Sequence, residues 1–152
     1  MRLTLHTDYA LRMLMLLALE PDGLHTIASV AKRYRISRNH LMKVAQTLIQ
    51  GGFVESVRGR HGGLRLAKDP SEIKLGAVVR TTEDAFSLVE CFDRKRNTCI
   101  VMPACGLRRP LEEALAAFLA VLDRTSLADL GNTAGRAAKL KRLLNESQSL
   151  AV

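Results

Sequence analysis

Cysteine is scarce in this chain of 152 residues, which has only Cys91, Cys99 and Cys105. An odd number of cysteines does not suit a framework of structural disulfides, which needs pairs and an oxidising compartment. A closed zinc site usually takes four cysteine or histidine ligands, often from Cys-x-x-Cys pairs. No such pair is present, and no histidine follows Cys91. These absences argue against both of the common structural uses of cysteine.

The sequence also has no long hydrophobic run. Its most apolar stretch, Met13–Leu19, is too short to cross a bilayer. Asp8 and Arg12 precede this stretch, and no small-x-small cleavage motif precedes Glu20, so a signal peptide is a poor interpretation. We therefore expect a buried helix in a cytoplasmic protein that has no membrane partner.

Groups that carry catalysis are missing as well. We recognise no paired general acid and base and no activated nucleophile. Gly62-Gly63 lies in a glycine-rich turn, but the Lys-Ser/Thr pair and the helix that complete a nucleotide-binding phosphate loop do not follow it. We expect that the protein is not an enzyme.

Positive charge is abundant and concentrated in one segment. The formal net charge is +8, and residues 32–65 hold eight Lys and Arg against the single acid Glu55. Such a balance indicates a polyanionic partner, although bulk charge does not separate nucleic acid from an acidic membrane surface.

Helical periodicity predicts three helices in the N-terminal third, over residues 7–19, 26–34 and 38–50. A tight turn separates the second from the third, for which Ser37 is a good N-cap, and Gly51 ends the third. This is the pattern of a helix-turn-helix, although an ordinary helical hairpin shares it. On the first helix, the expected core face consists of Leu11, Leu14, Met15 and Ala18.

Two alternating segments, 53–57 and 64–67, flank a basic glycine turn and predict a β-hairpin directly after the helix-turn-helix. A hairpin in this position is a wing. In such folds the start of the third helix enters the major groove, where Arg pairs with guanine and Asn with adenine, while the wing approaches phosphates or the minor groove. The DNA-binding candidates are Ser37, Arg38, Asn39, His40, Lys43, Arg58, Arg60, His61 and Arg65.

The rest of the chain divides into a short helix over 74–81, the cysteine loop and one long helix that starts near Pro110. Apolar residues give the long helix more than one face that can pack, which favours pairing with a second copy. The expected fold is mainly α with a small β-hairpin wing. The expected divisions are a winged helix-turn-helix DNA-binding domain over 1–80, a cysteine-bearing cluster loop over 81–108, a dimerisation helix over 109–130 and a C-terminal tail over 131–152.

The three cysteines share one polar loop with a C-x7-C-x5-C spacing. Thiolates favour soft metal centres, so a metal or iron-sulfur site is the favoured interpretation. Three incidental thiols remain the alternative. Spacing alone leaves a closed site one ligand short.

Four segments together resemble the iron-sulfur winged-helix repressors, and within them the nitric-oxide-sensing branch, over about residues 1–130. These segments are Thr7-Asp8-Tyr9-Ala10-Leu11-Arg12, Ser37-Arg38-Asn39-His40-Leu41-Met42-Lys43-Val44, Val57-Arg58-Gly59-Arg60-His61-Gly62-Gly63-Leu64-Arg65-Leu66 and the cysteine loop.

The resemblance implies the ligands that spacing does not give. An iron-sulfur cluster would be held by Cys91, Cys99 and Cys105 and by Asp8 of the partner subunit, with Arg12 orienting the aspartate. A [4Fe-4S] cluster is favoured over [2Fe-2S], because the [2Fe-2S] branch has a histidine just after its third cysteine and this chain has Gly106-Leu107-Arg108-Arg109 there.

The function that the resemblance implies is a homodimeric repressor that binds double-stranded operator DNA and releases it when nitric oxide reacts at the cluster. One alternative is the same fold sensing iron availability or cluster status. Another, from a different class, is a metal-stabilised structural adaptor that contacts protein.

Overall fold

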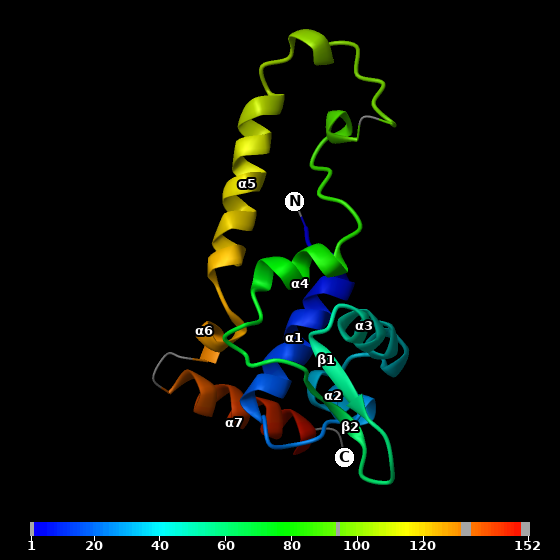
Figure 1. Ribbon diagram of the computed structural model, residues 1–152, viewed down its shortest axis with the longest axis vertical. Helices are drawn as coiled ribbons and strands as arrows, with labels where there is room; N and C mark the ends of the chain where they lie inside the picture. Colours follow the sequence, from blue (N-terminus) through cyan, green and yellow to red (C-terminus); the bar gives the residue numbers. More distant parts are fainter. Residues whose placement is uncertain (1, 94, 132–134, 150–152) are drawn as a thin grey trace.

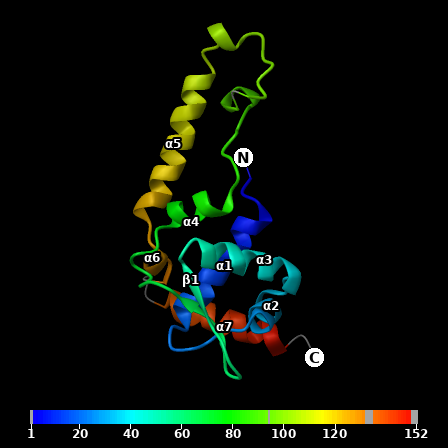
Figure 2. The same ribbon diagram turned by 45° about the vertical axis from the view of Figure 1, so that its right-hand side comes forward.

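The computed structural model describes residues 2–93, 95–131 and 135–149. Figure 1 shows a compact base of helices and a hairpin, from which α5 and the segment after α4 rise to a loop at the top. Figure 2 shows the same ribbon rotated about the vertical axis, and the loop again lies apart from the base. The elements are α1 (Leu5–Leu19), α2 (Ile27–Tyr34), α3 (Arg38–Gln50), β1 (Val54–Val57), β2 (Gly63–Leu66), α4 (Leu75–Thr82), α5 (Arg108–Arg124), α6 (Leu127–Gly131) and α7 (Arg136–Ser149).

Helix α1 forms the centre of the base, with α3, α4, α6 and β2 packed around it. It starts at Leu5, two residues before the predicted start, because the Thr4 hydroxyl caps it by accepting a hydrogen bond from the Thr7 N–H at 3.2 Å. The predicted core face was too narrow, since a central helix is covered on several sides. Fully buried positions include Ala10, Met13, Leu16 and Leu17, whereas Leu11, Met15 and Ala18 are partly buried.

The helix-turn-helix is formed by α2 and α3, which agree with the predicted segments to within one residue. Arg35 takes the left-handed conformation at φ 54°, which ends α2 and turns the chain within three residues. Buried Ile36 anchors that turn, and Leu41, Val44, Ala45 and Leu48 fix the inner face of α3. Ser37 lies at the N-cap position, but its side chain makes no capping hydrogen bond.

The predicted wing is present as the antiparallel pair β1 and β2, with Val57 opposite Gly63 at the turn. Gly62 permits the turn, because a Cβ there would lie 2.3 Å from the Val57 carbonyl oxygen. Two backbone hydrogen bonds between His25 and Leu64, at 3.0 and 2.8 Å, attach β2 to the segment before α2. The hairpin base is therefore fixed while its turn projects from the body, as Figure 1 shows.

Helix α5 leaves the base at its C-terminal end. There the Arg80 guanidinium of α4 donates two hydrogen bonds to the Asp123 carboxylate, at 2.5 and 2.8 Å. Gly76 permits this approach, because a Cβ at that position would overlap an Asp123 carboxylate oxygen. No residue of α5 is buried, and its apolar stripe is only half-covered within one chain.

Two differences concern the C-terminal third. The long helix predicted over 109–130 ends at Arg124, because Thr125 and Ser126 run in extended conformation against the start of α4, where the Thr125 carbonyl accepts from the Leu75 N–H at 3.0 Å. Ser126 and Asp129 then cap the short α6. The C-terminal tail predicted over 131–152 contains α7, which packs on α2 and buries Leu144. The parts of that tail at 132–134 and 150–152 lie outside the described residues.

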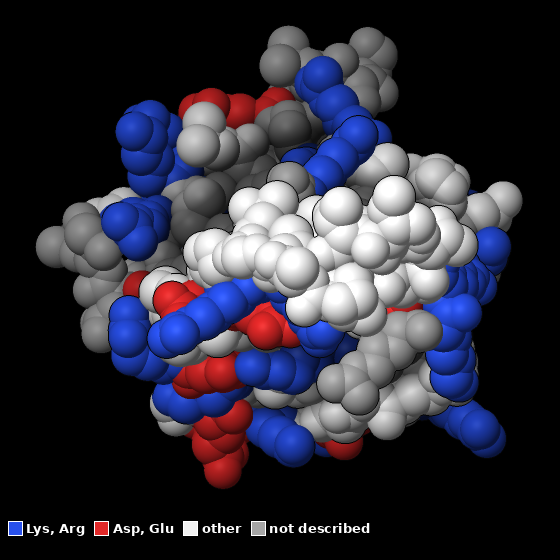
Figure 3. All heavy atoms as spheres, turned by 90° about the horizontal axis from the view of Figure 1, so that it is seen from above, with Lys and Arg blue, Asp and Glu red and all other residues white. Residues whose placement is uncertain are grey.

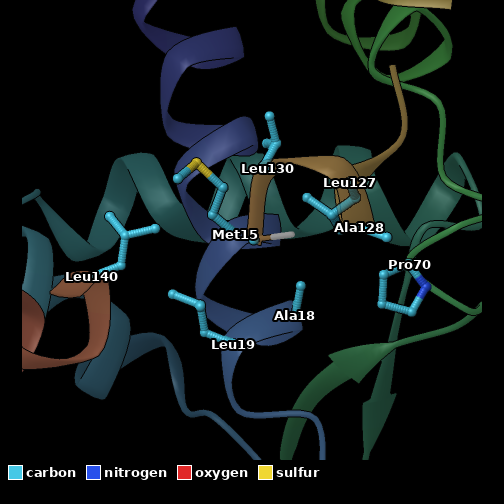
Figure 4. A pocket seen from close by; sticks show the side chains of 9 residues that line it. Met15, Ala18, Leu19, Pro70, Leu127, Ala128, Leu130 and Leu140 are labelled. Carbon is cyan, nitrogen blue, oxygen red and sulfur yellow. The ribbon is translucent and has the colours of Figure 1, made fainter. Parts of the chain in front are cut away.

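An apolar cavity of about 200 Å³ lies between α1, α6 and α7. Figure 4 shows Met15 and Leu19 of α1 facing it from one side and Leu127, Leu130 and Leu140 from others. Among the described residues that line it, none has an ionisable side chain. Its walls suit packing or a small apolar molecule and offer no group for acid–base chemistry.

A buried hydroxyl pair links α1 to α4, and its removal should lower stability. The Thr7 hydroxyl, fully buried, donates to the Thr82 hydroxyl at 2.8 Å. We expect Thr7→Val to reduce the free energy of unfolding by about 1–2 kcal/mol in urea, because the buried hydrogen bond between α1 and α4 is lost and the Thr82 hydroxyl keeps only its bonds within α4. Thr81→Val is the matched control, since that exposed hydroxyl bonds only within its own helix. Equal losses of unfolding free energy in the two variants would show that the buried pair stabilises the fold no more than an exposed hydroxyl does.

Candidate DNA-binding surface and cysteine loop

The first turn of α3 presents the predicted recognition residues to solvent. Ser37, Arg38, Asn39, His40 and Lys43 are all exposed, while Leu41 and Val44 between them face the core. Since the inner face holds the helix against α1, the outer face is free to enter a groove.

The wing turn carries Arg58, Arg60 and His61, also exposed. Arg65 differs from them. It lies on β2, where its side chain pairs with Glu55 on β1 at 2.5 Å. Part of its charge is thus neutralised within the hairpin, and Arg58 and Arg60 at the turn are better placed for phosphates.

One contact that the sequence did not predict joins α1 to the recognition helix. The rings of Tyr9 and His40 lie with centroids 6.1 Å apart at a tilt of 33°. Beside them, His6 Nε2 and the Thr47 hydroxyl are 3.1 Å apart. The aromatic pair spans about thirty positions of chain and has no periodic signature, so only the folded arrangement reveals it.

Asp8 and Arg12 lie one turn apart on α1, as predicted. The Arg12 Nε donates to one Asp8 oxygen at 3.0 Å, and its terminal nitrogen lies 2.7 Å from the other. Both side chains are more than one-third exposed. The Asp8 carboxylate is thus held in a fixed orientation at a surface that a second chain can reach. The charge of Arg12 also acts on Tyr34, where it opposes the burial that raises the pKa of Tyr34 to about 12.

The cysteine loop connects α4 to α5 at the top of the molecule. Cys91, Cys99 and Cys105 are half-buried free thiols. The Glu90 carboxylate accepts hydrogen bonds from the Thr98 N–H and hydroxyl, at 2.5 and 2.6 Å, and these bonds lower the pKa of Glu90. Within the described part of the chain, no group of three or more His, Cys, Asp or Glu is arranged to hold a metal ion.

The end of the molecule that carries this loop is rich in uncharged surface. Viewed from that end, Figure 3 shows a broad uncharged area with Lys and Arg around its edges. Large apolar side chains are exposed in and beside the loop at Ile100, Val101 and Leu107. Exposed apolar surface of this kind marks a site of contact with another molecule.

Comparison with known proteins decides the family. The sequence profile of the Rrf2 family, described as an iron-dependent transcriptional regulator, matches residues 3–133. The chain belongs to the Rrf2 family. This Rrf2 regulator is 55% identical over 131 residues to the HTH-type transcriptional regulator NsrR of Bacillus subtilis, covering 86% of this chain and 90% of that protein. It is 49% identical to the NsrR of Geobacillus kaustophilus, covering 96% and 98% of the two chains.

Solved structures confirm the fold expected for an Rrf2 regulator, mainly helical with a hairpin wing. CymR, the global cysteine regulator of B. subtilis, matches with a TM-score of 0.66 at 27% identity, over 86% of this chain and 95% of that one. IscR of T. potens matches with a TM-score of 0.68 at 25% identity, over 86% and 85%. The relatives are transcriptional regulators and not enzymes, as the sequence predicted. Across the part of the chain that the structure describes, no helix has the length and apolarity needed to cross a membrane.

Proposed function

We propose that this Rrf2 regulator is a cytoplasmic, homodimeric repressor that binds operator DNA and responds to nitric oxide through an iron-sulfur cluster, with [4Fe-4S] favoured over [2Fe-2S]. The observation that carries the proposal is the high identity to NsrR proteins along nearly the whole chain. The proposal includes the division into a DNA-binding unit over 1–80, a cluster loop over 81–108 and a dimerisation helix beyond it.

The donor chemistry of the cysteine loop fits such a cluster. Three free thiols lie in one short loop, and thiolates are the usual ligands of iron-sulfur clusters. Within the described residues of one chain, these thiols form no metal-holding group with one another or with a His, Asp or Glu. The partner's Asp8 would complete the set, and Arg12 would keep that carboxylate oriented. When bound, the cluster would supply an iron centre that reacts with nitric oxide.

The dimer would form along α5. Leu111, Leu115, Phe118, Leu119 and Leu122 follow one another along this helix at helical spacing, and each remains only half-covered within one chain. A second copy that covers this stripe would remove the exposed apolar surface, and would bring the α1 of one chain towards the cysteine loop of the other.

The route from sensor to DNA would run along α1. Asp8 lies one residue before Tyr9, which contacts His40 on the recognition helix. The Thr4 N–H and hydroxyl also bond to Glu83, at 2.8 and 3.0 Å, where the chain leaves α4 for the cysteine loop. A shift of Asp8 would therefore displace the recognition helix through direct contacts.

Anaerobic absorbance and native mass spectrometry during stepwise addition of nitric oxide test this function. A dimer that carries one cluster per chain, and that loses operator affinity as nitric oxide is added, supports it. Loss of affinity on iron chelation but not with nitric oxide would favour the iron-sensing alternative. A protein whose DNA binding is weak and indifferent to both treatments would favour the structural adaptor.

The wing should contribute through charge. Arg60→Ala is expected to weaken binding to operator and unrelated DNA by a similar factor, and to reduce the slope of log affinity against log salt by about 1, because one phosphate contact is lost. Arg65→Ala is the matched control, since Arg65 already pairs with Glu55. Salt titrations with each variant measure both slopes, and an unchanged slope for Arg60→Ala would remove the wing turn from the phosphate interface.

A further inference from the structure

The long gap between the first two cysteines is closed by a side chain. Cys91 and Cys99 are separated by seven residues, but Glu90, just before the first, accepts two hydrogen bonds from Thr98, just before the second. A glutamate side chain is short, so the backbone at residues 90 and 98 is held only a side chain's length apart.

Local backbone turns stabilise both ends of this closure. Residues Glu90–Phe92 form a 3-10 turn, in which the Glu90 carbonyl accepts from the Asp93 N–H at 3.1 Å. At the other end, the Asn97 side chain accepts from the Cys99 N–H at 3.1 Å. Cys91 and Cys99 therefore each come directly after a residue of the Glu90–Thr98 contact. A further hydrogen bond stabilises the backbone at each of these two places.

The second gap, between Cys99 and Cys105, is closed differently. The Cys99 carbonyl accepts from the Met102 N–H, and the Met102 carbonyl accepts from the Cys105 N–H, each at 3.3 Å. Two successive backbone turns thus shorten this five-residue gap. The first gap has two such turns as well, because the Glu90 carbonyl accepts from the Asp93 N–H at 3.1 Å and the Asp93 carbonyl accepts from the Arg96 N–H at 3.2 Å. These turns stop short of Thr98, and the Glu90 side chain makes the remaining connection.

We propose that Glu90 is a positioning residue, which holds Cys91 and Cys99 within reach of one another before any cluster is bound. This inference rests on the proposed function for its purpose, since the two thiols would then be two of the cluster's ligands, held near one another in advance. Because both donors belong to Thr98 and both bonds end on one carboxylate oxygen, removal of the Glu90 carboxylate breaks the whole contact. The amide oxygen of Glu90→Gln can still accept both bonds.

The test measures thiol proximity in the full-length protein without iron. In a Cys105→Ser background only Cys91 and Cys99 react, and a short bis-maleimide at low protein concentration either bridges them or modifies each singly. Mass spectrometry gives the ratio of bridged to doubly modified chains. Glu90→Ala should lower this ratio about three- to tenfold, as expected for the loss of an exposed, charge-assisted contact. Glu90→Gln should restore most of it, and Thr98→Val, which loses one of the two donors, should lie between.

Glu146→Ala is the matched control, because Glu146 is an exposed glutamate paired only with Arg142 in its own helix. The urea midpoint should stay the same in the Glu90 and Thr98 variants, since the described residues of segment 83–107 contribute nothing to the core. A ratio for Glu90→Ala within twofold of the unsubstituted protein would overturn the proposal, as would a Glu90→Gln ratio as low as that of Glu90→Ala.

Failure of this inference can be told apart from failure of the proposed function. If the unsubstituted protein takes up no iron under anaerobic reconstitution but the bridging ratios follow the expected order, the positioning role stands and the cluster proposal fails. If iron is bound and the ratios do not change, the cluster proposal stands and Glu90 has no positioning role.

Discussion

Replacing Cys99 with serine should abolish iron binding and leave the DNA-binding unit folded. Serine offers a hydroxyl that stays protonated at neutral pH in place of a thiolate, and iron-sulfur clusters are held by thiolates. Cys99 also lies at the end of the gap after Cys91 and at the start of the gap before Cys105. Its neighbour Thr98 bonds to Glu90, and its own carbonyl accepts from the Met102 N–H. We expect the visible absorbance and the bound iron of anaerobically purified Cys99→Ser to fall to background, and the operator affinity to become indifferent to nitric oxide.

The fold of Cys99→Ser should survive because the loop lies apart from the core. Among the described residues, none of the core side chains comes from 83–107. Circular dichroism and the urea midpoint should therefore match the unsubstituted protein. Ser87→Ala, an exposed substitution in the same segment, is the control and should keep its iron. If Cys99→Ser retained a full complement of iron, the three-cysteine ligand set would be wrong.

The second large effect is expected at the start of the recognition helix. Arg38→Ala should lower the affinity for specific operator DNA by about 1–3 kcal/mol, or roughly five- to 150-fold, the usual range for a lost bidentate contact between arginine and guanine. Arg38 is exposed and its side chain has no partner among the described residues, so the substitution removes a contact to DNA and not a support of the fold. Affinity for unrelated DNA should fall much less.

Competition binding with operator and scrambled duplexes at one salt concentration separates these two effects. Lys139→Ala on α7 is the control, since it removes one exposed positive charge away from the helix-turn-helix. A uniform loss for Arg38→Ala on operator and scrambled DNA would assign Arg38 to phosphate and move sequence recognition to Asn39 or His40.

The helix-turn-helix and the wing were predictable because local rules determine them. Leu41, Val44 and Leu48 give α3 an unambiguous helical period, and the glycines of the wing turn permit a conformation that other residues would block. The start of α1 was misjudged because Thr4 and Thr7 are both good capping residues, and only the bond between them selects Thr4.

The parts that sequence did not reveal depend on contacts between distant segments. Arg124 and Ser126 carry no strong helix-breaking signal, and α5 ends there because the chain pairs with the start of α4. No helix was predicted for the C-terminal tail, where α7 gains its stability from packing on α2 and not from its own propensity. The contact between Glu90 and Thr98 joins two residues of an irregular loop, where no periodicity applies.

Helix α5 packs on α4, and the Arg80–Asp123 pair lies near the C-terminal end of α5, so that this end can act as the pivot of a lever. Its pivot lies at the C-terminal end, and its 17 residues place the cysteine loop about 25 Å from that pivot. A tilt of about 5° at the pivot would move the far end by about 2 Å, a large displacement for groups that must meet ligand-bond distances. Weakening the Arg80–Asp123 pair would thus move the cysteine loop without altering a cysteine. Asp123→Asn is the mildest substitution that weakens this pair.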